Sequence, residues 1–138
     1  MRAVLDPNVL IAALLSREGA PAQIVSRWLA GGFELVVSEL LLVELERALA
    51  YPKLRAHITR DEAAEFISLL GASATLAPDA ANAPRRSADP RDDYLMALAE
   101  TQRAVLVSGD RHLLDLGDQF PIQAPRTFLD TLARPTGG

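Results

Sequence analysis

Four acidic side chains stand where folding would bring them close to the interior of the protein. Asp6 and Asp110 directly follow short apolar runs, and Glu44 and Asp92 fall among apolar residues in helical patterns. An unpaired buried carboxylate is costly, so such acids must be paired, protonated or bound to a cation. The sequence places no Lys or Arg to neutralise them. Magnesium or manganese, which favours oxygen ligands, is therefore the expected counter-charge.

Metal-assisted hydrolysis of a phosphodiester is the chemistry that such a cluster would perform. A bound divalent ion lowers the pKa of water and stabilises charge on the phosphate as it is cut. The 138-residue chain contains no cysteine, which excludes thiolate zinc sites, disulfides and a cysteine nucleophile. Any metal must be held by oxygen or by His57 and His112, and we interpret both histidines as surface residues.

Helical periodicity supplies the argument for Glu44. An apolar arc runs along the helix that follows Ser38, and Glu44 falls inside it, whereas Glu46 falls on the opposite side. The arc consists of Leu40, Leu41, Leu45, Ala48 and Leu49.

The same reasoning favours Asp92 over its neighbour in the helix that begins at Pro90. Asp92 continues the apolar arc of that helix by one turn, and Asp93 is expected to project outward beside Glu100. A second interpretation of Asp92 stays open, because acids in a first helical turn are favoured by the helix dipole alone.

The remaining pattern alternates strands with helices. Strands are expected at residues 3–5, 33–37, 73–77, 104–108 and 122–124. Helices are expected at residues 9–15, with Pro7 in the first turn, and at 22–30, 39–49, 59–70, 90–102, 112–116 and 127–133, with caps at Ser38, Thr59, Asp89 and Thr127. This order predicts a three-layer α/β/α sandwich with a mostly parallel sheet of four or five strands. Ligands bind beyond the carboxyl ends of such strands, where Asp6 and Asp110 would lie.

Size and composition predict one domain over residues 1–134 and a disordered tail over 135–138. No apolar run approaches the roughly 18 residues of a membrane span, and an acid occurs too early for a signal peptide, so we expect a cytoplasmic protein with no membrane contact. The net charge of −4 argues against a nucleic-acid binder, but setting the four acids aside leaves 14 acidic against 14 basic residues. Thirteen of the basic residues are arginines, which suit phosphate contacts, although a GC-rich genome is the simpler explanation.

With these residues identified, the sequence resembles the PIN-domain nucleases over nearly its whole length. Four segments carry the resemblance, and in each the family's acidic metal ligand falls on one of the four acids. Residues 4–11 contain Asp6, residues 38–45 contain Glu44, residues 89–99 contain Asp92, and residues 105–114 contain Asp110. Pro7 departs from the family, which usually has Thr or Ser there, so Asn8 and Ser108 are expected to support the ligands by hydrogen bonds.

The resemblance implies an endoribonuclease that depends on Mg²⁺ or Mn²⁺ and cleaves single-stranded or structured RNA. It also implies the toxin of a bacterial toxin–antitoxin pair, often a homodimer, with an antitoxin segment over the acidic cleft. Arginines at positions 85, 86, 91, 103 and 111 would rim the site, although ordinary solvated arginines are an equal alternative.

Several further assignments remain open at this point. Asp93 and Asp115 are possible extra acids, although Asp115 on a short turn has the simpler explanation of a solvated charge, and Trp28 is expected in the core. A rival hydrolase would use Asp6 as the nucleophile, but such enzymes usually need a second acid where this chain has Asn8. An inactive interaction module with the same fold is the other alternative.

Overall fold

The protein is built on a five-stranded sheet in which every neighbouring pair of strands is parallel. The computed structural model describes residues 1–81, 83 and 90–134, and the side chains at positions 90 and 91 are not described. The strand order is β3-β2-β1-β4-β5. The strands are β1 (Arg2–Leu5), β2 (Glu34–Val37), β3 (Thr75–Leu76), β4 (Val105–Val107) and β5 (Ile122–Gln123).

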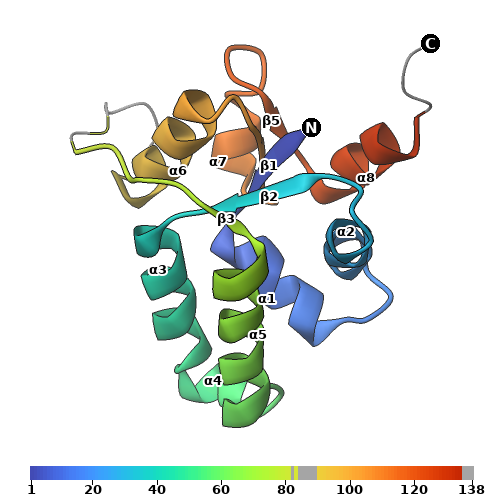
Figure 1. Ribbon diagram of the computed structural model, residues 1–138, viewed down its shortest axis with the longest axis vertical. Helices are drawn as coiled ribbons and strands as arrows, with labels where there is room; N and C mark the ends of the chain where they lie inside the picture. Colours follow the sequence, from blue (N-terminus) through green and yellow to red (C-terminus); the bar gives the residue numbers. More distant parts are fainter. Residues whose placement is uncertain (82, 84–89, 135–138) are drawn as a thin grey trace.

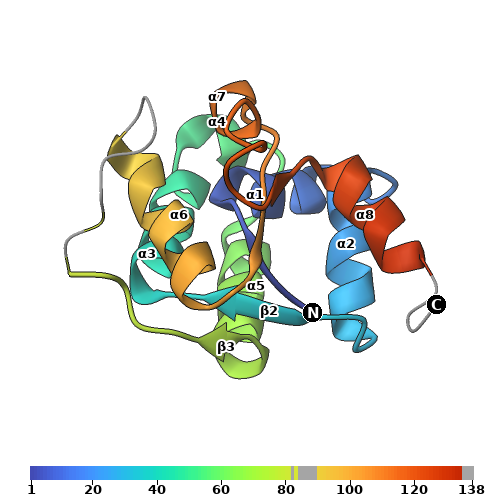
Figure 2. The same cartoon turned by 90° about the horizontal axis from the view of Figure 1, so that it is seen from above.

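Helices cover both faces of this sheet and complete three layers. Figure 1 shows α3 and α5 on one side of the strands and α6 on the other. The helices are α1 (Pro7–Leu15), α2 (Ala20–Leu29), α3 (Glu39–Leu49), α4 (Pro52–Arg55), α5 (Arg60–Ser73), α6 (Pro90–Thr101), α7 (Arg111–Leu114) and α8 (Pro125–Ala133). The view from above in Figure 2 shows α8 beside α2, which it contacts. The predicted three-layer fold with a parallel sheet is confirmed.

The central strand determines where a site can form. Ala3, Val4 and Leu5 are all fully buried, because helices cover both faces of a parallel sheet and its central strands become continuously apolar. Strand β1 pairs with β2 on one side and β4 on the other, and Leu5 lies opposite Val107. The strand order therefore reverses at β1, and a crevice at the carboxyl end of β1 and β4 is expected.

Local signals explain most of the element boundaries. The Ser38 hydroxyl accepts the Leu41 N–H at 3.3 Å, and Thr59 forms the predicted capping box with Glu62. Trp28 is buried in the core, as predicted.

The observed elements differ from the prediction in several places, most clearly in α4, α5 and α8. Helix α4 was not expected, and α5 continues to Ser73, which leaves only two residues for β3. Helix α8 starts at Pro125 after Ala124, so the prediction of Thr127 as its cap was wrong, since the fixed φ of proline suits a first helical turn. The predicted cap Asp89 lies outside the described residues. Among the helices that the structure describes, none is long and apolar enough to cross a membrane.

Candidate active site

A cavity of about 630 Å³ opens at the carboxyl edge of the sheet, and all four predicted acids line it. Asp6 reaches it from the end of β1, Asp110 from the end of β4, Glu44 from α3 and Asp92 from α6. Its other lining residues are Pro7, Asn8, Leu40, Val43, Arg47, Ala48, Tyr51, Tyr94 and Leu95. Segments that are far apart in the sequence therefore present four carboxylates to one hollow.

Asp6 is the most buried of these acids, with an exposed fraction of 5%. It caps α1, where its Oδ1 accepts the Asn8 backbone N–H at 2.9 Å, and its Oδ2 accepts the Ser108 hydroxyl at 2.9 Å. Burial raises the pKa of the Asp6 carboxyl, and the charge of Asp110 raises it further, against the lowering effect of the two hydrogen bonds. The charged form of Asp6 is thus only partly compensated by the protein itself.

Ser108 connects the two aspartates at the strand ends. Its hydroxyl donates to Asp6 and accepts the Asp110 backbone N–H at 3.0 Å, and the residue is fully buried. Asp110 in turn caps α7 by accepting the His112 N–H at 2.8 Å. One hydroxyl therefore holds both the carboxylate of Asp6 and the backbone of Asp110. Asn8, by contrast, holds Asp6 through its backbone N–H. The residue is exposed and lines the cavity.

Glu44 accepts a hydrogen bond from the hydroxyl of Tyr94, a residue of α6 that also lines the cavity. Burial raises the pKa of the Tyr94 phenol, and the hydrogen bond to Glu44 and the charges of Glu44, Asp6 and Asp79 raise it further. The phenol therefore keeps its proton and acts as a donor to the carboxylate.

The orientation predicted for the two neighbouring acids of α6 was wrong in part. Asp92 lines the cavity and is partly exposed, whereas Asp93, expected to project outward, is buried with an exposed fraction of 2%. Residues 95–99 are all buried, so the core encloses α6 around most of its circumference. Because α6 has no clear solvent-exposed side, helical periodicity cannot predict which of its two acids points toward the cavity.

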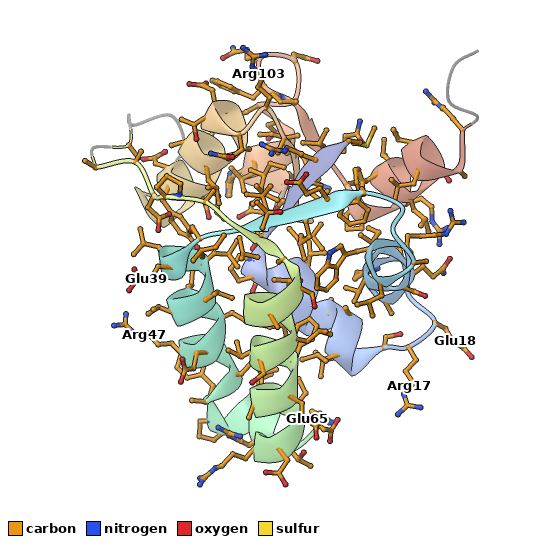
Figure 3. The ribbon with its side chains drawn as sticks, in the orientation of Figure 1. Arg17, Glu18, Glu39, Arg47, Glu65 and Arg103 are labelled. Atoms are coloured by element: carbon orange, nitrogen blue, oxygen red, sulfur yellow. The ribbon has the colours of Figure 1, made fainter. Side chains whose placement is uncertain are left out.

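The apolar arc of α3 also needs a correction. Leu41, Leu45 and Leu49 are buried, but Leu40 is 48% exposed and Val43 39% exposed. Glu44 is partly buried, so it lies at the border between the core side of α3 and its exposed side. Figure 3 shows Arg47 on the outer side of α3, away from α5, and it is the one cationic residue among the described residues that line the cavity.

The structure does not bring every predicted residue to the site. Within the described part of the chain, no three acidic or histidine side chains stand close enough together to hold a metal ion as they are placed. Asp115, His57, His112 and Arg111 are exposed and do not line the cavity. Arg103 is also exposed, and in Figure 3 it projects from the far side of the sheet relative to α3. Arg85, Arg86 and the side chain of Arg91 lie outside the described residues.

Sequence reasoning missed several residues of this region, among them Tyr94, Asp79 and Arg47. Tyr94 lies within the helix predicted at residues 90–102, Asp79 lies between that helix and the strand predicted at residues 73–77, and neither was given a role. Asp79 Oδ2 accepts the Leu40 N–H at 3.0 Å in the first turn of α3, where backbone donors lack helical partners. The sequence did hold a signal for Asp79, because it is an acid that comes soon after the expected third strand. The carboxyl ends of parallel strands share one edge, so such a residue is expected near the site.

Fold and site together define a small parallel α/β domain with an acidic cavity at the point where strand order reverses. The family model described as PIN domain matches residues 2–112, and the chain belongs to the PIN domain family.

Solved structures share this fold at low sequence identity. PAE2754 from Pyrobaculum aerophilum is 21% identical, with 96% of each chain covered and a TM-score of 0.65. VapBC2 from Rickettsia felis, bound to a DNA fragment from its promoter, is 13% identical, with 90% of this chain and 98% of that chain covered and a TM-score of 0.62. VapBC-1 from nontypeable Haemophilus influenzae is 18% identical, with coverage of 91% and 99% and a TM-score of 0.61. No curated protein matches the chain.

Proposed function

We propose that this PIN domain is a metal-dependent endoribonuclease that acts in the cytoplasm as the toxin of a toxin–antitoxin pair. One observation carries the catalytic part of the proposal. Asp6, Glu44, Asp92 and Asp110 come from four separate segments and line a single cavity at the carboxyl edge of the sheet. Family membership supports a nuclease, and the VapBC structures with the same fold support the role of a toxin.

The donor atoms of the cavity fit Mg²⁺ or Mn²⁺. All four acids offer carboxylate oxygens, and the raised pKa of Asp6 indicates a negative charge for which the protein supplies too little compensation. Because no three acidic side chains among the described residues are close enough as placed, binding of an ion requires some of these ligands to move. When bound, the metal supplies an activated water and neutralises charge on the phosphodiester.

The protein's own residues have separable roles in this proposal. Ser108 and the Asn8 backbone hold Asp6 at the end of β1, and Ser108 also holds the backbone of Asp110. Arg47, on the exposed wall of the same cavity, is placed to contact a phosphate of the RNA strand. Asp92 is the proposed ligand from α6, and Asp93 is the alternative on the same helical turn.

An RNA-cleavage assay with and without EDTA tests this function. We expect Asp6→Asn, Glu44→Gln, Asp92→Asn and Asp110→Asn each to reduce metal-dependent cleavage by about 100-fold or more, since each removes a charged ligand. The matched control is Asp115→Asn, an exposed acid away from the cavity, which should cleave like the wild type. Retained cleavage in the four variants, or cleavage in EDTA, would refute the proposal.

Asp93→Asn decides between the two acids of α6. If Asp92 is the ligand, Asp93→Asn should retain cleavage per folded molecule, whatever its effect on stability as a buried residue. The fraction of folded protein is measured by circular dichroism alongside the assay. Loss of cleavage from Asp93→Asn but not from Asp92→Asn would transfer the ligand role to Asp93.

The proposed antitoxin would occupy the exposed wall of the cavity. Leu40 and Val43 leave an apolar stripe beside four acids, which suits a segment that carries apolar side chains and an Arg. Co-purification with the product of a short adjacent gene tests this partner, and Val43→Asp should weaken the complex. A homodimer is also proposed, and light scattering of the purified protein measures it. An inactive module would bind the partner and leave RNA uncut.

A further inference from the structure

Tyr94 connects the two helices that flank the cavity from opposite faces of the sheet. Its partly exposed side chain comes from α6, and its hydroxyl donates to Glu44 Oε2 on α3. Figure 1 shows these two helices on opposite sides of the strands. Both residues line the same cavity as Asp6 and Asp110. Tyr94 takes no part in the proposed metal chemistry, but its hydroxyl contacts Glu44 directly.

The geometry of a carboxylate allows this hydrogen bond and a metal contact at the same time. Tyr94 occupies Oε2, so Glu44 can offer Oε1 to a cation while the hydrogen bond persists. A free glutamate side chain must lose rotamer freedom when it binds an ion. A side chain already held by a hydrogen bond from a packed helix has lost part of that freedom before the ion arrives.

We propose that Tyr94 is a positioning residue whose hydroxyl orients Glu44 and thereby sets the affinity of the cavity for a divalent cation. This inference rests on the proposed function, because it requires Glu44 to be a metal ligand. The phenol ring alone, by packing between α6 and the cavity, would not have this effect. The hydroxyl and the ring are therefore the two features that an experiment must separate.

Calorimetric titration of the full chain with Mn²⁺, without RNA, makes this separation. Tyr94→Phe removes the hydroxyl and keeps the ring, and we expect it to weaken Mn²⁺ binding by about 10-fold or more, as loss of a partner behind a metal ligand does. Glu44→Gln should also weaken binding. In the double variant, loss of the hydroxyl should cause no further weakening, because Tyr94 acts through Glu44. The matched control is Tyr51→Phe, which removes the hydroxyl of a tyrosine that is 64% exposed in the same cavity and should bind Mn²⁺ like the wild type.

Each other outcome overturns a defined part of the reasoning. Wild-type affinity in Tyr94→Phe, or a double variant in which the two losses simply multiply, would leave the metal site intact and refute the positioning role. Reduced stability of Tyr94→Phe in EDTA combined with unchanged Mn²⁺ affinity would assign Tyr94 to packing and also refute it. Equal affinity of the wild type and Glu44→Gln would instead refute Glu44 as a ligand, and with it the proposed metal site.

Discussion

Ser108 offers the sharpest test of how the site is held together. Ser108→Ala removes the hydroxyl that donates to Asp6 Oδ2 and accepts the Asp110 N–H, both at a residue with no exposed surface. A hydrogen bond to a charged group contributes about 1.5–3 kcal/mol and one between neutral groups about 1 kcal/mol. We therefore expect the free energy of unfolding to fall by about 2–4 kcal/mol at neutral pH in the absence of metal.

The pH dependence of this loss identifies its cause. The pKa of Asp6 is raised in the folded protein above its ordinary value of 3.8, so the folded state loses stability as the pH rises through the raised pKa. Without Ser108, the charged carboxylate loses a stabilising partner and its pKa rises further. The effect of Ser108→Ala should therefore be larger at about pH 7 than at about pH 3, which lies below the ordinary value of 3.8 and hence below the raised pKa of Asp6.

Urea denaturation in EDTA at both pH values measures this difference. The matched control is Ser38→Ala, a second fully buried serine that follows a strand but accepts only a backbone N–H. Ser38→Ala should lower the free energy of unfolding by about 1 kcal/mol at both pH values. If the two variants lose equal free energy of unfolding, independent of pH, the Ser108 hydroxyl does not stabilise the charged form of Asp6 and the reasoning is refuted.

Three further predictions concern neighbouring residues. In EDTA, Asp6→Asn should raise the melting temperature at neutral pH, with a gain that shrinks toward pH 3.8; a gain independent of pH would contradict the raised pKa of Asp6. Asp79→Ala should lower the free energy of unfolding, measured by urea denaturation, by about 0.5–2 kcal/mol, because the first turn of α3 loses an acceptor. An unchanged midpoint of the urea transition would contradict this. Leu45→Ala, at a fully buried position, should lower the free energy of unfolding in urea denaturation by about 2–5 kcal/mol. Leu40→Ala should lower it by less than about 1 kcal/mol, and equal losses in the two variants would contradict the orientation of α3.

The sequence alone determined the order and type of the main elements. The apolar run before Asp6, the serine cap at Ser38 and the capping box at Thr59 are local signals, and each acts over a few residues. They predict alternating strands and helices, and from that alternation a parallel sheet and its ligand-binding edge. Asp6 and Asp110 could be placed at this edge because Asp6 directly follows β1 and Asp110 lies soon after the end of β4.

Only the tertiary structure decided which way the acidic side chains of the helices point. Residues 95–99 of α6 are all buried, so periodicity could not show that Asp93 is buried while Asp92 reaches the cavity. Likewise, Leu40 fits an apolar arc in the sequence but lies on an exposed wall, because the core contacts α3 through Leu41 and Leu45. The contacts of Tyr94 with Glu44 and of Asp79 with α3 join residues 50 and 39 positions apart. Such pairings depend on which elements pack together, and a local pattern does not carry that information.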